Sequence, residues 1–380
     1  MKALVYHGRK DLRYEDFPDP SPAPGEVLLQ IKSSGLCHTD FNEYLNGPLY
    51  VAETPHAKTG RSIPLVLGHE FSGEVLELGD GVARLQVGDR VAVNAVDSCR
   101  RCEFCRRGLF IHCANAAIIG FGRDGGYAEY AAVPEDCCHI LRPNVSFRAA
   151  ALVEPLSVAL HSVRRTRVEI GSTAAIVGGG TIGLCTLQAL RACGVIDVYV
   201  IERSPAKRHF AEQLGASGFI QSEVSDPLQV ISDLTGGIGV DYAFECVGTG
   251  SALQTALNVT RPGGTVCLSG VVPHPIEFNW NDVLKTEKTI TTTIAYSSEF
   301  PMVIAMLNDG RLKAESLISQ SYPLNEAREV LTRFEELGRS NIKMLIDMNV
   351  GAERGKTEPA SAEFFEAFTT ERRKSFRSDL

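Results

Sequence analysis

Short hydrophobic runs that alternate with polar residues characterise the first 150 positions of the chain. They occur at 27–31, 73–78, 90–93 and 127–133, and glycine, proline or aspartate residues separate them. Alternation with a period of two, broken by such turn residues, is typical of β-strands. The pattern therefore predicts a mainly β region at the amino-terminal end of the chain.

The pattern changes after Pro155, where buried-strand runs begin to alternate with helical periodicity. We expect strands at 173–177, 198–201, 241–246 and 265–268, and helices at 181–192 and 204–214. Strands separated by helices predict parallel βαβ units. This region is therefore expected to form a doubly wound parallel sheet of the Rossmann type, which makes the protein an α/β protein.

The pattern is mixed again from about residue 297, with a helix expected at 300–307 and a strand at 342–346. The simplest arrangement inserts a nucleotide-binding domain into a β-rich catalytic domain. We therefore expect a catalytic domain at 1–155, a Rossmann domain at 156–296, a return to the catalytic domain at 297–349 and a charged tail at 350–380. The tail is poor in large aliphatic residues and is expected to hold at most one amphipathic helix, at 362–368.

The composition fits a globular protein with two domains and narrows the classes of partner. The chain has 380 residues, of which 44% are hydrophobic and 22% are charged. A net charge of −8 argues against nucleic-acid binding, which needs a basic surface. No apolar stretch approaches the roughly 20 residues that span a bilayer, and the first residues do not resemble a signal peptide. We therefore expect neither nucleic acid nor a membrane as a partner.

The cysteines indicate both a compartment and a metal site. Of eleven cysteines, five lie in a spacing or context that suggests metal binding, and most of the others lie in apolar strand or helix patterns. Free thiols together with metal thiolates indicate a reducing environment, so we expect a cytoplasmic protein. The strongest spacing is the run Cys99, Cys102, Cys105 and Cys113. Four thiolates so close together can bind one tetrahedral zinc ion with no open position, which predicts a structural site rather than two disulfides or four unrelated cysteines.

A glycine motif at 178–183 predicts a dinucleotide site. The sequence Gly-Gly-Gly-Thr-Ile-Gly follows the expected strand at 173–177 and opens the expected helix, which is the context that the G-x-G-x-x-G pattern requires. Gly178 would make the tight turn, Gly180 would let the backbone approach the pyrophosphate, and Gly183 would allow close helix packing. Thr181 begins the helix whose amino-terminal end would receive the phosphates.

Glu202 ends the next expected strand, at the distance typical of the acidic residue that binds the ribose hydroxyls. A carboxylate at this position repels a 2′-phosphate and therefore favours NAD over NADP. Arg203 follows immediately and weakens this preference. A plain tight turn is the alternative interpretation of the glycines, and Glu202 argues against it.

A second, dispersed set of residues could bind a catalytic metal. It comprises Cys37, the pair His69-Glu70, and Glu154. One thiolate, one imidazole and one carboxylate leave the fourth position of zinc open to water or an alcohol. Spacing alone does not separate this interpretation from a lone cysteine and a structural His-Glu pair.

Together these motifs resemble those of the zinc-containing medium-chain alcohol dehydrogenases. The resemblance rests on Gly68-His69-Glu70 followed by Gly73, Gly79 and Val82, on the four-cysteine run and on the later glycine motif, and it covers about residues 1–347. It implies a GroES-like catalytic domain beside the Rossmann domain. Within the family the chain is most similar to the polyol and (R,R)-2,3-butanediol dehydrogenases, because of Val153-Glu154-Pro155-Leu156 and the long segment at 44–60.

The resemblance also implies roles for individual residues. Cys37, His69 and Glu154 would hold the catalytic zinc, with Glu70 beside it as an exchangeable ligand. Further implied roles are orientation of His69 by Asp40, acceptance of the substrate proton by Thr39, a pyrophosphate contact by His38, and cofactor contacts by Ile182, Glu202 and Lys207. Two zinc ions and one NAD per chain, and a homodimer or homotetramer, are the corresponding expectations.

The sequence departs from the family pattern at three places. Asn42 stands where members often have a histidine that ends the proton relay, Ala295 stands where sorbitol dehydrogenases tend to have arginine, and the tail after 347 is long. The missing arginine favours a small substrate. We therefore predict a hydride transfer between a small secondary alcohol or vicinal diol and NAD. The alternatives are a sorbitol, xylitol or L-threonine dehydrogenase and, from another class, a zinc-ribbon binding protein without catalytic activity.

Overall fold

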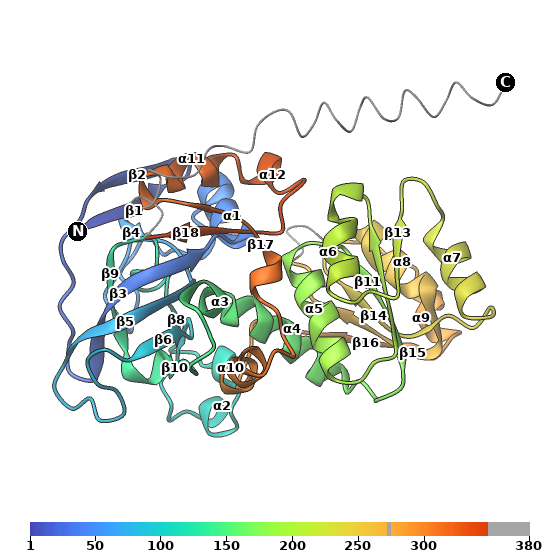
Figure 1. Ribbon diagram of the computed structural model, residues 1–380, viewed down its shortest axis with the longest axis horizontal. Helices are drawn as coiled ribbons and strands as arrows, with labels where there is room; N and C mark the ends of the chain where they lie inside the picture. Colours follow the sequence, from blue (N-terminus) through green and yellow to red (C-terminus); the bar gives the residue numbers. More distant parts are fainter. Residues whose placement is uncertain (272–274, 349–380) are drawn as a thin grey trace. The chain divides into compact units, whose positions relative to one another are not determined.

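The computed structural model describes residues 1–271 and 275–348 (Figure 1). Residues 1–348 form one compact unit. The charged tail, with the helix expected at 362–368, lies outside the described residues. Within the described ranges, none of the helices combines the length and the apolar character that a membrane crossing requires.

The predicted β-rich region forms three antiparallel or mixed sheets. A small sheet has the order β2-β1-β4, and β7 pairs with β8. The main sheet has the order β10-β6-β5-β3-β18-β17, with β9 pairing β3. The bounds are β1 Lys2–Gly8, β2 Asp11–Asp16, β3 Glu26–Gly35, β4 Leu65–Val66, β5 Glu70–Leu78, β6 Arg90–Val93, β7 Val96–Asp97, β8 Ala117–Ile118, β9 Tyr130–Pro134, β10 Cys138–Ile140, β17 Ile318–Tyr322 and β18 Lys343–Asp347.

The last described strand, β18, returns to the sheet that the amino-terminal strands begin. It pairs antiparallel with β3, with Leu345 opposite Gly35 and Asp347 opposite Ser33. Strand β17 continues the sheet by parallel pairing with β18. Figure 1 shows the red strands β17 and β18 beside the blue strand β3. Segments more than 300 positions apart in the sequence therefore pair within one sheet.

The second region forms a six-stranded parallel sheet of order β13-β12-β11-β14-β15-β16. This is the strand order of the dinucleotide-binding fold, and it confirms the predicted Rossmann-type architecture. The strands are β11 Thr173–Val177, β12 Asp197–Glu202, β13 Gly218–Gln221, β14 Val240–Glu245, β15 Thr260–Leu268 and β16 Thr289–Thr292. The sheet's helices are α5 Thr181–Ala192, α6 Arg208–Gln213, α7 Pro227–Leu234, α8 Gly250–Val259 and α9 Asn281–Leu284.

The helix α4, Val153–Thr166, joins the two regions and buries one face. It contains Pro155 in its first turn, where the missing N–H costs no hydrogen bond. It packs against α5 and α10. Because the strands on either side belong to different sheets, we propose the division near residues 155 and 296. The remaining helices are α1 His38–Asn46, α2 Glu103–Arg106, α3 Phe147–Ala151, α10 Phe300–Asn308, α11 Ala327–Thr332 and α12 Phe334–Leu337.

Candidate active site

Three predicted metal donors lie together where β3 and β5 meet. Cys37 is the residue before α1, just after the end of β3, and His69 immediately precedes β5, which begins at Glu70. The antiparallel register places Gly35 opposite Glu70. One donor atom from each of Cys37, His69 and Glu70 lies within 4.8 Å of the others. The fold thus brings Cys37 to the adjacent residues His69 and Glu70, which lie 32 and 33 positions further along the chain, and forms one group of thiol, imidazole and carboxylate.

Two glycines allow this close approach. A Cβ added at Gly35 would lie 2.2 Å from Glu70 Oε2. Gly68 has φ of +97°, and a Cβ there would lie 2.7 Å from the ring of Tyr127. Side chains at either position would displace the donor group, which explains why glycine precedes His69.

Buried groups fix the orientation of His69. Asp40 Oδ1 lies 3.3 Å from His69 Nδ1. The other oxygen of Asp40 accepts hydrogen bonds from the Tyr127 hydroxyl at 2.6 Å and from the Cys37 backbone N–H at 3.3 Å. Burial lowers the pKa of His69, but the charges of Asp40 and Cys37 outweigh it and raise the pKa well above its usual value. This arrangement leaves Nε2 of His69 for a metal, as is usual for a metal-bound imidazole.

A buried lysine faces the same group. Lys343 in β18 forms an ion pair with Glu70 Oε2, and each side chain is only 2% exposed. Its Nζ also donates a hydrogen bond to Leu36 O at 2.9 Å. Burial lowers the pKa of Lys343, but Glu70 and Cys37 raise it above its usual value, so the ammonium stays charged. The sequence analysis missed both Lys343 and Tyr127.

Glu154 lies in the first turn of α4 and does not join the group of donors within 4.8 Å. Burial raises the pKa of Glu154 to about 7; His69 opposes this rise and the carboxylate of Glu70 adds to it. Its carboxyl group therefore interacts electrostatically with His69 and Glu70, while it lies outside the group of three donors.

Aromatic and hydroxyl groups border the donors. The centroid of the Phe121 ring lies 5.1 Å from the centroid of the His69 ring and 5.3 Å from that of the Tyr50 ring. Thr39 Oγ1 lies 3.5 Å from Cys37 Sγ. The ring of His38 packs edgewise on Phe41 and Phe334.

The donor chemistry fits zinc. Sulfur, imidazole nitrogen and carboxylate oxygen are the ligands that catalytic zinc sites combine. The supporting carboxylate of Asp40 is fully buried, and so is the hydroxyl that contacts it. A cationic metal would balance the negative charges gathered here, which one lysine does not neutralise alone.

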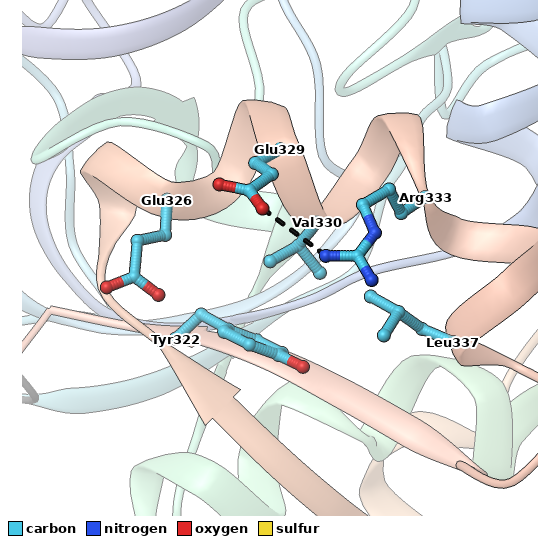
Figure 2. A pocket seen from close by; sticks show the side chains of 6 residues that line it. All are labelled: Tyr322, Glu326, Glu329, Val330, Arg333 and Leu337. Atoms are coloured by element: carbon cyan, nitrogen blue, oxygen red, sulfur yellow. Dashed lines mark hydrogen bonds and ion pairs between the residues drawn. The ribbon is translucent and has the colours of Figure 1, made fainter.

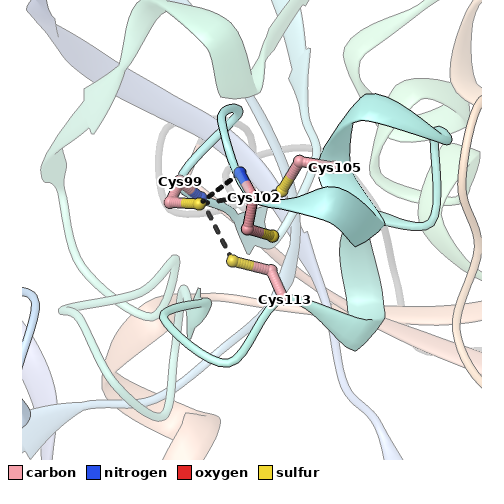
Figure 3. Close-up of side chains that lie close together, drawn as sticks. All are labelled: Cys99, Cys102, Cys105 and Cys113. Carbon is pink, nitrogen blue, oxygen red and sulfur yellow. Dashed lines mark hydrogen bonds between the residues drawn. The ribbon is translucent and has the colours of Figure 1, made fainter.

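The four-cysteine run forms a separate cluster in the loop around α2 (Figure 3). One sulfur from each of Cys99, Cys102, Cys105 and Cys113 lies within 4.8 Å of the others. All four thiols are free, so the disulfide alternative finds no support. The sulfurs of Cys99 and Cys105 are 3.9 Å apart. Sulfurs at about 2.3 Å from a tetrahedral zinc ion would be about 3.8 Å apart, so the cluster fits the metal.

Backbone N–H groups already favour a thiolate in this cluster. Those of Arg101 and Cys102 lower the pKa of Cys99 to about 6. The Cys105 N–H also lowers the pKa of Cys102, but burial and the neighbouring thiols outweigh it and raise that pKa to about 11, so the first thiolate forms at Cys99. The Cys102 N–H lies 3.4 Å from Cys99 Sγ, and the Cys99 N–H lies 3.4 Å from Cys113 Sγ. Metal binding requires deprotonated sulfur, so these contacts support the predicted structural site.

The glycine motif lies between β11 and α5, as predicted. Gly178 has φ of +104°, which the tight turn requires. A Cβ at Gly183 would lie 1.9 Å from Gly178 O, whereas a Cβ at Gly180 would meet nothing within 4 Å. Close packing at Gly183 and open space at Gly180 match the two roles expected of them. Thr181 Oγ1 donates to Ile342 O at 2.6 Å, and Ile182 is partly exposed beside it.

Glu202 closes the other side of this turn. Its Oε2 accepts a hydrogen bond from the Gly179 N–H at 2.7 Å, and its Oε1 accepts from the N–H groups of Arg203 and Ser204, each at 2.9 Å. Lys207 Nζ lies 3.8 Å from Glu202 Oε2. The carboxylate is thus held at the end of β12, next to the glycine turn.

A small surface pocket lies between β17 and the helices α11 and α12 (Figure 2). Arg333, which lines the pocket, pairs with Glu329 at 3.3 Å and with Glu336 at 3.0 Å. The pocket contains none of the predicted site residues, and we assign no chemistry to it. Its lining residues are Tyr322, Glu326, Glu329, Val330, Arg333 and Leu337.

Comparison with known proteins supports the same two regions. Residues 23–143 match the alcohol dehydrogenase GroES-like domain, and residues 181–309 match the zinc-binding dehydrogenase model. The chain is 35% identical to (R,R)-butanediol dehydrogenase of Bacillus subtilis over 92% of this chain and 100% of the relative. It is 31% identical to sorbitol dehydrogenase of the same species over 92% of this chain and 98% of the relative.

The fold is similar to a crystal structure of 2R,3R-butanediol dehydrogenase from Bacillus subtilis. The TM-score is 0.85 and the sequences are 34% identical, over 91% of this chain and 99% of that chain. The likeness thus includes the β-rich region, the parallel sheet and the returning strands.

Proposed function

The chain belongs to the family of zinc-binding alcohol dehydrogenases, and on this premise we propose that it transfers a hydride between NAD and a small secondary alcohol or vicinal diol, of the 2,3-butanediol and acetoin type. One observation carries the proposal: Cys37, His69 and Glu70 offer a thiol, an imidazole and a carboxylate within 4.8 Å. A zinc-ribbon binding protein without activity does not account for this second donor group or for the family.

Bound zinc supplies a Lewis acid that lowers the pKa of an alcohol hydroxyl, and NAD accepts the hydride. We propose that Cys37, His69 and Glu154 hold the catalytic metal, with Glu70 as an exchangeable group. Cys99, Cys102, Cys105 and Cys113 would hold the structural ion.

Thr39 is our candidate for the first proton acceptor, because its hydroxyl lies 3.5 Å from Cys37 Sγ. Asn42 cannot titrate, so in this proposal the proton passes from Thr39 to water through the cofactor ribose or His38. Asp40 takes no part in this proton path and would instead hold the His69 ring in position.

A small substrate is supported by the residues around the donors. Tyr50 and Phe121 contribute aromatic surface beside His69. Ala295 carries no charge with which to bind the distal hydroxyls of a long polyol, and its neighbour Tyr296 is fixed by a hydrogen bond from the Ala95 N–H at 3.0 Å. A polyol such as sorbitol or xylitol remains the second candidate, because a sorbitol dehydrogenase is 31% identical to the chain.

The proposed cofactor is NAD rather than NADP. Glu202 holds a carboxylate beside the glycine turn through three backbone N–H groups. A 2′-phosphate would meet this negative charge. We propose Gly178, Gly180, Thr181, Ile182, Gly183, Glu202 and Lys207 as the cofactor-binding residues.

A substrate panel tests the proposal. Formation of reduced nicotinamide is followed by its absorbance with each stereoisomer of 2,3-butanediol, with sorbitol, with xylitol and with L-threonine, using NAD and NADP separately. We expect the highest kcat/KM with a butanediol isomer and NAD. A higher value with sorbitol or xylitol would favour the second candidate, and no turnover of any alcohol by zinc-loaded protein would overturn both.

We also propose that the protein is a cytoplasmic homodimer or homotetramer. The free thiols of the chain fit a reducing compartment. Strand β16 is an edge of the parallel sheet, and apolar side chains in the segments that flank it are more than half exposed, at Trp280, Leu284 and Ile294. Apolar exposure of this kind is typical of interfaces. Light scattering coupled to size exclusion gives the subunit number, and a monomer would contradict this proposal.

A further inference from the structure

Lys343 is the one buried ammonium that contacts the candidate zinc donors in the described part of the chain. Its Nζ pairs with Glu70 Oε2, and both side chains are 2% exposed. A buried cation repels a metal ion nearby, and in a low-dielectric environment that repulsion is substantial. Zinc would therefore bind more strongly without the charge of Lys343. The presence of this lysine at the site is thus not explained by metal affinity.

The position of Lys343 is set by backbone contacts on both of its sides. Strand β18 pairs with β3, with Leu345 opposite Gly35, and the preceding carbonyl of Ile342 accepts the hydroxyl of Thr181 at 2.6 Å. A Cβ at Gly35 would lie 2.2 Å from Glu70 Oε2 and 3.0 Å from Lys343 Cε. The bare backbone of Gly35 thus provides the space in which the ion pair forms.

Glu70 is shared between this lysine and the metal position. Its carboxylate belongs to the group with Cys37 and His69, all within 4.8 Å. When zinc is present, the zinc ion and the Lys343 ammonium both attract the single negative charge of Glu70. The attraction of Glu70 to zinc is then weaker than it would be without the ammonium.

We propose that Lys343 is a positioning residue that restrains Glu70 from becoming a permanent zinc ligand and so keeps one coordination position open to the substrate. This inference rests on the proposed zinc site. It has an unusual sign: removing the lysine makes the protein hold catalytic zinc more tightly and bind the alcohol more weakly. Damage to the site of any ordinary kind would loosen the metal instead.

The test compares Lys343→Met with Lys343→Arg. Methionine keeps an unbranched apolar chain and removes the charge, whereas arginine keeps the charge and is the matched control. Zinc release from the holoenzyme into excess chelator is followed with a zinc-sensitive dye. We expect the catalytic zinc of Lys343→Met to be released about tenfold more slowly, the size of effect typical of groups that orient metal ligands, and that of Lys343→Arg to resemble wild type. The four-cysteine site provides an internal reference, because its release should be equal in all variants.

A second measurement covers the case in which the methionine variant folds poorly without metal. The melting temperature is determined with zinc and after chelation. We expect the zinc-dependent increase to be larger in Lys343→Met than in wild type, since only zinc then neutralises Glu70. The KM of the zinc-loaded variant for the alcohol should rise about tenfold or more, with a smaller change in kcat, because the substrate competes with Glu70 for the open position.

The same substitution in a Glu70→Gln background decides whether Lys343 acts through Glu70. We expect most of the slower release to disappear in the double variant, which leaves only the relief of the direct repulsion between Lys343 and the metal. Faster zinc release from Lys343→Met, or an equal change in the presence and absence of Glu70, would overturn the inference. Failure of the proposed function would look different, because wild type would then bind zinc at the four-cysteine site alone.

Discussion

Asp40 Oδ1 lies 3.3 Å from His69 Nδ1 in a part of the site where both side chains are buried. The carboxylate therefore selects which ring nitrogen points to the proposed metal. We expect Asp40→Asn to weaken zinc binding at this site by about 10-fold to 100-fold. Competition with a chelator measures this loss. Tyr127→Phe removes only the hydroxyl that contacts Asp40 Oδ2, so its loss of zinc affinity should be smaller than that of Asp40→Asn. A larger loss in Tyr127→Phe would contradict the view that Tyr127 acts on His69 through Asp40.

Loss of a donor should abolish activity without unfolding the protein. Cys37→Ser and His69→Ala remove one donor each from the group within 4.8 Å. We expect turnover to fall to background while the circular dichroism spectrum stays close to wild type and the melting temperature falls by no more than the stabilisation that the lost zinc ion gives. Normal turnover with an unchanged zinc content in either variant would refute the assignment of the catalytic site.

The four-cysteine cluster should behave in the opposite way. Cys102→Ser removes one of its four sulfurs, and we expect a lower melting temperature together with the loss of one zinc ion per chain. Cys193→Ser is the control, because Cys193 is a free thiol outside both donor groups. An unaltered melting temperature with abolished turnover in Cys102→Ser would indicate that the cluster is catalytic instead.

Cofactor choice depends on Glu202. Replacing its carboxylate in Glu202→Ser removes the negative charge that faces the ribose and leaves Arg203 free to meet a 2′-phosphate. We expect the ratio of kcat/KM for NADP to that for NAD to rise by about a hundredfold. The comparison requires both cofactors at the same alcohol concentration. An unchanged ratio would show that other groups determine the preference.

The loss of folding stability at acid pH should arise partly from protonation of Glu299. This buried carboxylate accepts hydrogen bonds from Arg164 at 2.5 Å and from the Ser297 N–H at 2.7 Å, and it lies 3.2 Å from His161 Nδ1. Burial raises the pKa of Glu299, but His161, the Ser297 N–H and Arg164 outweigh it and lower the pKa below its usual 4.5. The folded form therefore binds its proton less readily than the unfolded chain.

The stabilisation from Glu299 is accordingly present above the unfolded pKa and is lost as the pH falls through the folded pKa. We expect Glu299→Gln to cost about 2 kcal/mol of unfolding free energy at pH 7. Urea denaturation across the pH range tests this: the difference should begin to shrink near the usual pKa of 4.5 and vanish below the lower pKa of the folded state. A difference in unfolding free energy that persists at acid pH would show that the charge of Glu299 is not its cause.

Local patterns predicted the features whose determinants are close in the sequence. The four cysteines span 15 positions and the glycine motif six, so their spacing, with a strand before and a helix after the glycines, indicated their chemistry. The expected helix at 181–192 coincides with α5, and the expected strand at 342–346 differs from β18 by one residue at each end. These elements follow from periodicity and turn residues, which tertiary contacts alter little.

Residues that act over long separations could not be found in this way. Lys343 donates to a carbonyl 307 positions away, and Tyr127 contacts a carboxylate 87 positions away. An isolated lysine in a strand and an isolated tyrosine after two glycines carry no local signal. Their roles follow only from the sheet pairing that brings β18 against β3, and from the backbone space at Gly35 and Gly68.

The position of β18 has a consequence for the order in which the protein can mature. The ribosome releases the strands around Cys37 and His69 early, but their sheet stays incomplete until residues 343–347 emerge. A nascent chain therefore carries the metal donors for most of its synthesis without the lysine that contacts Glu70. Messages truncated shortly before codon 343 would yield proteins with a nearly whole dinucleotide fold and an open edge on β3.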